Sequence, residues 1–268
     1  MPAYFITIDV GNSRIKCGLF EATDVRGEGL PTCRESMTVA VDADLPWPTI
    51  REWIDPHASV KGIVAGANPR GVQRVLDTWP AKQLPRPLVI DIPTGVPIDV
   101  KVAAPEKVGV DRLLNAVAAN RLRCDSRPAI IVSTGTATTV DYVDASGAFA
   151  GGAILPGFEL SARALHEYTA LLPLITIEEL AAQPQPLGKD TRQALCSGLF
   201  WGQVGAVREL IGQFAALDNA AKQVILTGGG AALLAPQFPE ALREPHLALQ
   251  GLAIVAAGRL NASETDRV

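Results

Sequence analysis

Three turns rich in glycine and small polar residues punctuate the chain, and each follows a short run of apolar or β-branched residues. They occupy residues 9–13, 133–137 and 227–230. Glycine lets a backbone approach a bulky anion closely, and clustered backbone N–H groups favour negative charge. Because each turn ends an apolar strand candidate, the pattern predicts a nucleotide-binding α/β protein whose phosphate contacts lie at strand ends.

The two halves of the chain open in the same way. Strand candidates at residues 4–8 and 15–20 flank the first turn, and strand candidates at 129–132 and 138–143 flank the second. Further strands and helices follow in each half, which indicates an internal duplication. We therefore expect an N-terminal domain at residues 1–118 and a C-terminal domain at 119–268. The final apolar helix, residues 247–260, could pack back on the first domain.

Among the predicted helices, residues 110–123 show the clearest amphipathic pattern. Leu113, Leu114 and Val117 share its apolar face, whereas Asn115 is placed off that face. Asp111 lies in the first turn, where the helix dipole favours a carboxylate.

Composition excludes several classes of protein. The chain has 268 residues and a net charge of −4, so a broad basic surface for nucleic acid or an anionic membrane is not expected. No apolar run reaches the length of a membrane span, and residues 1–10 read as a strand rather than a signal peptide. The four cysteines have no metal-ligand spacing, which favours a reducing, cytoplasmic setting. The three histidines are scattered and predict no zinc site.

The first turn combines the groups that a metal-bound phosphate needs. Asp9 offers a carboxylate for a divalent ion, and Lys16 offers a cation at the start of the returning strand. Gly11, Asn12 and Ser13 offer hydrogen-bond donors between them. The alternative interpretation is an ordinary surface hairpin.

The second and third turns offer further donors. Gly135 and Thr136 lie in a stretch of small hydroxyl residues, which also suits an ordinary threonine-rich strand. Gly228 and Gly229 follow an apolar strand, and their bare backbone would let a flat base lie against it. A flexible connector is the alternative there, although apolar residues flank both sides of it.

A fourth segment, residues 109–112, could act on a substrate. Asp111 could serve as a general base for a hydroxyl, and the planar fork of Arg112 could grip a carboxylate. The alternative is an ordinary helix start with an exposed arginine. The sequence contains neither a P-loop motif nor a nucleophile elbow, so other common kinase and hydrolase classes are not indicated.

Taken together, these motifs resemble one enzyme family. Asp-x-Gly-Asn-Ser, Gly-x-Asp-Arg, Gly-Thr-Ala-Thr-Thr-x-Asp, Gly-Gly-x-Ile-x-Pro-Gly and Thr-Gly-Gly-Gly follow one another between residues 9 and 230. In this order they are similar to type III pantothenate kinases, including relatives named Bvg accessory factor, within the acetate and sugar kinase, Hsp70 and actin superfamily. The resemblance implies two RNase H-like (actin-like ATPase) domains, each with a mixed sheet flanked by helices, and a cleft between them.

The resemblance also implies an activity and a set of site residues. The family phosphorylates pantothenate to 4'-phosphopantothenate with ATP and a divalent ion such as Mg²⁺, the first step of coenzyme A synthesis. It assigns ATP and its phosphates to the three turns and the divalent ion to Asp9. It assigns pantothenate to Gly109, Val110, Asp111, Arg112 and Thr191, with Asp111 as the proton acceptor.

Ser133 departs from the family pattern. It stands where the family has an aspartate that binds a monovalent cation, K⁺ or NH₄⁺, so a requirement for that cation is open. The family works as a homodimer whose pantothenate pocket is close to the subunit interface. Two other functions remain open at this point: a non-catalytic nucleotide-binding regulatory protein of the same fold, and a kinase for a sugar or acetate.

Overall fold

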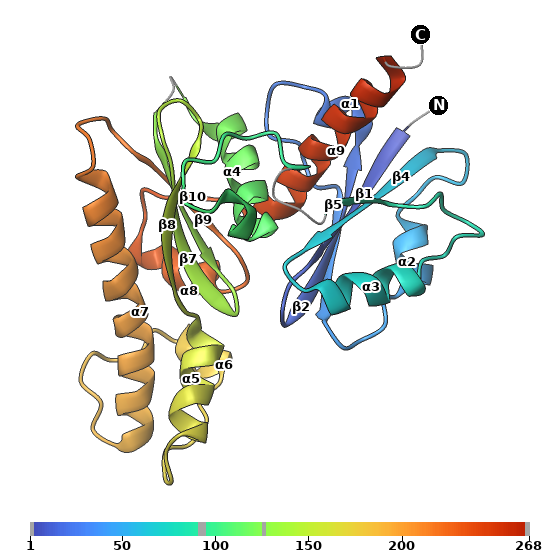
Figure 1. The fold of residues 1–268 in the computed structure, drawn as a ribbon. Coiled ribbons are helices and arrows are strands. Elements are labelled where there is room, and N and C mark those ends of the chain that lie inside the picture. Colours follow the sequence, from blue (N-terminus) through green and yellow to red (C-terminus); the bar gives the residue numbers. More distant parts are fainter. Residues whose placement is uncertain (1–2, 91–94, 125–126, 266–268) are drawn as a thin grey trace. The chain divides into compact units, whose positions relative to one another are not determined.

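The computed structural model describes residues 3–90, 95–124 and 127–265. The chain forms two compact units (Figure 1). Unit 1 consists of Met1–Cys124, Gly147–Phe149 and His246–Val268, and unit 2 consists of Asp125–Ser146 and Ala150–Pro245. Whether independently folding domains lie at 1–118 and 119–268 stays a prediction.

Unit 1 is built on a five-stranded mixed sheet in the order β3-β2-β1-β4-β5. An antiparallel hairpin joins its first two strands, and β3 continues this antiparallel pairing on the far side of β2. On the other side, β4 and then β5 add in parallel. The strands are β1 (Ala3–Val10), β2 (Arg14–Glu21), β3 (Glu35–Ala40), β4 (Ser59–Gly66) and β5 (Leu88–Ile90).

Helices cover both faces of this sheet. Alternate residues of β1, among them Ile8 and Val10, pack in one core with Ile50 of α2 and Val75 of α3. Because side chains alternate along a strand, Asp9 faces the opposite side, where α9 packs on β1, β2 and β4 beside α4 (Figure 1). The helices are α1 (Ala22–Val25), α2 (Trp47–Glu52), α3 (Pro69–Asp77), α4 (Val110–Leu122) and α9 (Leu247–Thr265), with a 3-10 turn at Pro105–Lys107.

Helices α4 and α9 approach each other closely in unit 1. A Cβ atom built on Gly251 of α9 would lie 2.0 Å from the carbonyl oxygen of Leu114 in α4. That distance is shorter than any van der Waals contact, so only glycine allows this packing. The close approach brings the starts of both helices to the same face of the sheet as Asp9.

Unit 2 repeats the sheet of unit 1. Its order, β10-β9-β6-β7-β8, is the same arrangement with β6 in the place of β1. An antiparallel hairpin joins β6 and β7, while β9 pairs in parallel with β6 and β10 in parallel with β9. The strands are β6 (Ala129–Thr134), β7 (Ala137–Val143), β8 (Phe149–Pro156), β9 (Gln223–Thr227) and β10 (Leu242–Arg243).

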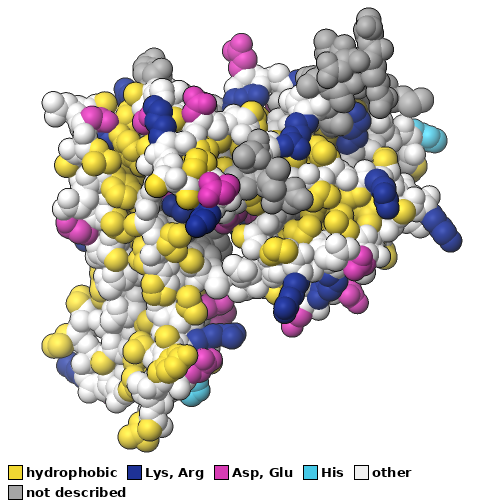
Figure 2. Space-filling view, in the orientation of Figure 1, with side chains coloured by type: hydrophobic (Ala, Val, Ile, Leu, Met, Phe, Trp, Pro, Cys, Tyr) yellow, Lys and Arg dark blue, Asp and Glu magenta, His cyan; other side chains and the backbone are white. Residues whose placement is uncertain are grey.

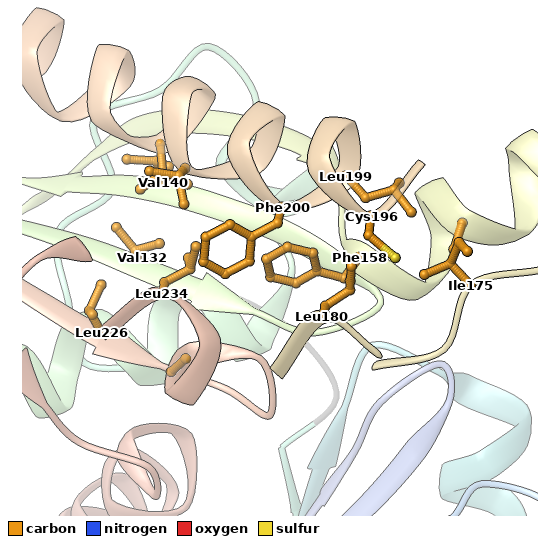
Figure 3. Packing of buried hydrophobic residues seen from close by; sticks show 14 of the residues in the cluster. Val132, Val140, Phe158, Ile175, Leu180, Cys196, Leu199, Phe200, Leu226 and Leu234 are labelled. Carbon is orange, nitrogen blue, oxygen red and sulfur yellow. The ribbon is translucent and has the colours of Figure 1, made fainter. Parts of the chain in front are cut away.

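The core of unit 2 lies between this sheet and its helices. Phe158 of α5, Leu180 of α6, Phe200 of α7, Leu234 of α8 and Val132 of β6 belong to one buried hydrophobic cluster (Figure 3). Figure 1 shows that the first part of α7 continues beyond the sheet, alongside α5. The helices are α5 (Phe158–Glu167), α6 (Ile177–Ala181), α7 (Thr191–Ala215) and α8 (Ala231–Leu234), followed by a 3-10 turn at Ala235–Gln237.

The predicted fold class is confirmed: both units are α/β, with mixed sheets flanked by helices. Both opening hairpins, the long helix after residue 109 and the internal duplication are confirmed as well. Five short elements were not predicted, namely α1, β3, α6, α8 and β10. Among the described residues, no helix combines the length and the apolar character needed to cross a bilayer.

Candidate active site

The first turn closes the hairpin between β1 and β2. The backbone N–H of Gly11 donates to the carbonyl oxygen of Arg14 at 2.9 Å, which leaves Asn12 and Ser13 exposed at the tip. In the strand register, Asp9 stands directly opposite Lys16. The hairpin thus presents a carboxylate, an ammonium group and a tip of small polar residues within one short segment of unit 1.

The second part of the site in unit 1 is the start of α4. Gly109 precedes the helix, and a Cβ atom built on it would lie 2.6 Å from Oδ1 of Asp111. The Asp111 carboxylate therefore folds back over Gly109, in space that a larger residue would fill. Val110 is buried and anchors this turn in the core. The guanidinium carbon of Arg112 lies over the Phe149 ring, 5.2 Å from its centre, in a cation–π contact.

Electrostatics link these two parts of unit 1. Burial raises the pKa of Asp9 to about 6, Lys16 opposes this increase, and the negative charge of Asp111 adds to it. The influence of Asp111 on Asp9 means that the start of α4 lies near the end of β1. The structure thus brings Asp111 towards Asp9 and Lys16, from which it is far removed in the sequence.

Asp9 has the properties of a carboxylate that would bind a divalent ion together with a substrate. It is 6 % exposed, and its Oδ1 accepts no hydrogen bond from the described residues. Within the described part of the chain, no three His, Cys, Asp or Glu side chains gather to form a metal site. Mg²⁺ is commonly held by one or two carboxylates, substrate phosphates and water, so the residues present fit an ion that arrives with a nucleotide.

In unit 2, the second turn closes the hairpin between β6 and β7. Gly135 donates its N–H to Ala137 at 2.9 Å, and the carbonyl oxygen of Thr136 accepts from the N–H of Gly157 at 3.0 Å. A Cβ atom on Gly157 would lie 2.2 Å from the carbonyl oxygen of Gly135. The start of α5 therefore packs directly on the backbone of this turn.

The third turn lies beside the second. Gly228 has a φ of +88°, and a Cβ atom there would lie 2.4 Å from the carbonyl oxygen of Thr134. The same oxygen accepts from the N–H of Gly230 at 2.9 Å. A Cβ atom on Gly229, by contrast, would have no neighbour within 4 Å, so its backbone is open to a ligand. Unit 2 thus brings its two glycine turns together around Thr134.

Two further predicted residues belong to unit 2. Ser133 lies in β6, opposite Thr139 of β7 and Thr227 of β9, and is partly exposed. Thr191 is the exposed first residue of α7, where the Asp190 side chain accepts from the N–H of Gln193 at 2.8 Å. Its neighbour Arg192 forms an ion pair with Glu179 of α6, so Thr191 lies at the end of α7 that faces α6.

Sequence reasoning missed two polar residues of unit 1. Asn115 was placed off the apolar face of its helix, but it is 3 % exposed, and its Oδ1 accepts no hydrogen bond from the described residues. Its spacing of four from Asp111 was the available signal, because such residues share a helix face. His246 precedes α9, and burial followed by the charge of Lys16 lowers its pKa. No spacing in the sequence predicts that Lys16 acts on His246.

Comparisons with known proteins identify the family. The model of the type III pantothenate kinase family matches residues 5–213. A type III pantothenate kinase of Paramagnetospirillum magneticum is 32 % identical, over 92 % of this chain and 94 % of that protein. Its counterpart in Listeria monocytogenes serovar 1/2a is 30 % identical, over 98 % and 99 %.

Solved structures agree on the fold. A Baf-family protein from Campylobacter jejuni is similar with a TM-score of 0.60 and 18 % identity, over 96 % of this chain and 99 % of that one. This likeness extends through both sheets and so covers the whole arrangement described above. With the family model matching most of its length, the chain belongs to the type III pantothenate kinase family.

Proposed function

We propose that this protein transfers the γ-phosphoryl group of ATP to the primary hydroxyl of pantothenate, the first step of coenzyme A synthesis. Family membership supports the reaction. The observation that carries the assignment of residues is that α4 packs on α9 and β4, next to β1, so that the charge of Asp111 helps to raise the pKa of Asp9. One carboxylate suits a metal-bound phosphate, and the other suits the alcohol that attacks it.

For ATP, we propose contacts in each unit. In unit 1, Lys16 would pair with phosphate oxygens, and the hairpin tip would donate hydrogen bonds through Gly11, Asn12 and Ser13. In unit 2, the glycine turns around Thr134 would contribute Gly135, Thr136, Gly228 and Gly229. The support is the open backbone at Gly229 and the exposed position of Gly135. Backbone N–H groups at such turns are well suited to anions.

Asp9 would hold the divalent ion, which supplies positive charge that neutralises the phosphates during transfer. The unpartnered, buried Oδ1 of Asp9 supports this assignment. Ser133 occupies the position proposed for a monovalent cation. A serine hydroxyl is a weaker cation ligand than a carboxylate, so we expect at most a modest stimulation by K⁺ or NH₄⁺.

For pantothenate, we propose that Arg112 meets the carboxylate with two parallel N–H donors. The contact with Phe149 supports this role, because it restrains the guanidinium before the substrate arrives. Gly109 and Val110 would offer their backbone beside the substrate. Thr191, exposed at the start of α7, is the proposed contact furthest along the chain.

In the proposed reaction, Asp111 orients the hydroxyl of pantothenate and accepts its proton. The hydroxyl oxygen forms a bond to the γ-phosphorus while the bond from that phosphorus to the β,γ-bridging oxygen breaks, and ADP leaves. Positioning and electrostatic stabilisation supply most of the acceleration in phosphoryl transfer. Lys16 would stabilise the charge that spreads over the transferred group.

A substrate panel tests the function. ADP release is measured with pantothenate, an N-alkyl pantothenamide, glucose and acetate, each at saturating ATP and Mg²⁺. We expect ADP release with pantothenate. The N-alkyl pantothenamide should give only weak release, because it has no carboxylate for Arg112 to bind. Release only with a sugar or acetate would contradict the proposal, and nucleotide binding without any release would point to a regulatory protein.

We also propose that the protein works as a homodimer. Figure 2 shows apolar side chains on the part of unit 2 that contains α5 and the start of α7, and monomers seldom expose large apolar patches. Leu171, for instance, is 90 % exposed. We call this set the α5 surface: Ile154, Leu160, Leu165, Tyr168, Leu171, Leu174 and Leu187.

A further inference from the structure

His246 is the residue on which α9 begins. Its carbonyl oxygen accepts the first hydrogen bond of the helix, from the N–H of Gln250 at 2.9 Å. The N–H groups of the first helical turn have no partner within a helix, and they carry partial positive charge. The imidazole of His246 therefore stands at the positive end of a helix of 19 residues.

The packing of α9 on β2 places the start of α9 at the same end of the sheet as Lys16. A Cβ atom built on Gly18 would lie 3.1 Å from Cδ1 of Leu249. Lys16 and Gly18 share one face of β2, because they are two residues apart. His246 and Leu249 share one side of α9, because they are three apart. Leu249 therefore covers Gly18, and His246 lies one turn earlier, towards Lys16.

Few charged groups share this end of the sheet. On the elements packed against α9, they are Arg14 and Lys16 of β2, Asp9 of β1, and Asp111 and Arg112 of α4. Lys61 of β4 pairs with Phe5, near the other end of β1, and Asp24 of α1 follows the far end of β2. Among these groups Lys16 is the one that acts on His246: partial burial, and then this charge, lower the pKa of the imidazole.

We propose that His246 is a further phosphate-binding residue, which takes up a proton when a nucleotide's phosphates reach Lys16. This inference rests on the proposed function. In the free protein, burial and the charge of Lys16 lower the pKa of the imidazole and so favour its neutral form at pH 7. Phosphate oxygens reverse the sign of the local potential, so the protonated imidazole becomes favourable and donates a charge-assisted hydrogen bond.

Calorimetry tests the inference directly. A non-hydrolysable ATP analogue is titrated without metal at pH 7, in buffers of different ionisation enthalpy, into the wild type, His246→Gln and the control His57→Gln. The control changes a residue outside the site, on the exposed segment after α2. The slope of the binding enthalpy against the buffer enthalpy gives the number of protons taken up. Proton uptake by Asp9 and by the nucleotide is common to all three proteins, so the difference isolates His246.

We expect His246→Gln to take up fewer protons than the wild type and His57→Gln to match the wild type. The loss of one charge-assisted hydrogen bond should weaken binding of the analogue about tenfold at pH 6.5. Near pH 8.5, where the imidazole stays neutral, the two affinities should converge. Equal proton uptake, or an affinity ratio that does not change with pH, would overturn the inference. If the wild type binds the analogue with Mg²⁺ but not without it, the inference fails and the proposed function stands. If it binds the analogue under neither condition, both fail.

NMR of the wild-type protein provides a second measurement, which does not depend on the folding of His246→Gln. The chain has three histidines, so the imidazole resonances of the wild type can be assigned with His246→Asn and His57→Gln. We expect the resonances of His246 alone to move from the neutral to the protonated position when the analogue is added at pH 7. A His246 resonance that stays at the neutral position in the saturated complex would contradict the proposal.

Discussion

At the scale of single residues, the candidate site costs stability. Asp9 is a buried carboxylate, and burial and Asp111 together outweigh the favourable effect of Lys16 on its charge. A carboxyl group whose pKa is higher in the folded protein than in the unfolded chain destabilises the fold once it ionises. A metal ion and a nucleotide would compensate for this unfavourable charge.

Replacing Asp9 by Asn should therefore stabilise the metal-free protein at neutral pH. The pKa rises from 3.8 to about 6 on folding, which corresponds to about 3 kcal/mol when the group is fully ionised. The advantage of Asp9→Asn should be absent at low pH, grow between about pH 4 and pH 6, and stay constant above that. Denaturant unfolding at several pH values measures it, with the exposed Asp44→Asn as a control. An Asn variant less stable than the wild type at pH 7 would contradict this account.

Single residues also show which parts of the candidate site the sequence could predict. Asp9, Lys16 and Asp111 were predicted as site residues because their chemistry is visible in their own segments. The burial of Asn115 and the position of His246 were not predicted, because both depend on the packing of α9 against α4 and β2. Local patterns carry no information about which distant helix covers a strand.

At the scale of elements, the contact between α4 and α9 orients one end of the candidate site. Gly251→Ala should destabilise the protein by about 1–3 kcal/mol, because its Cβ atom would overlap the backbone of Leu114. Gly258→Ala, in the same helix with no neighbour within 4 Å, should stabilise it by about 0.5–1 kcal/mol. Thermal unfolding measures both, and similar effects of the two changes would show that α9 does not pack as described.

The third glycine turn offers a second matched pair. Gly228→Ala should destabilise the fold, because Gly228 has a positive φ and lies against the backbone of Thr134. Gly229→Ala has free space around it, so stability should hardly change, whereas the KM for ATP should rise if the nucleotide lies against that backbone. Steady-state kinetics with both variants checks this, and an unchanged KM in Gly229→Ala would remove Gly229 from the site.

At the scale of the whole molecule, the sequence predicted an internal duplication, and the structure shows it as one sheet order repeated in both units. The alternating hairpins and the small-residue turns carried that information. The missed elements are short or lie at a sheet edge: β10 has two residues, and α6 has five. Such segments are stabilised by tertiary contacts more than by their own pattern, so their sequences carry little signal.

The oligomeric state is a property of the whole molecule that the α5 surface should decide. Leu171→Glu places a charge on that surface and should convert a dimer to a monomer. Leu217→Glu is a suitable control, because Leu217 is 65 % exposed but follows the opposite end of α7. Light scattering after size-exclusion chromatography measures the mass. A wild type that is monomeric at micromolar concentration would contradict the proposed dimer.

The central claim is that Asp111 accepts the proton of the pantothenate hydroxyl. Its most direct test is the transfer of labelled γ-phosphate from ATP to pantothenate at saturating substrates, in the wild type, Asp111→Asn and Glu106→Gln. We predict that kcat falls about 10²–10⁴-fold in Asp111→Asn. It should stay near the wild-type value in Glu106→Gln, which changes an exposed residue shortly before α4. Full labelling of pantothenate by Asp111→Asn at the wild-type rate would contradict the claim.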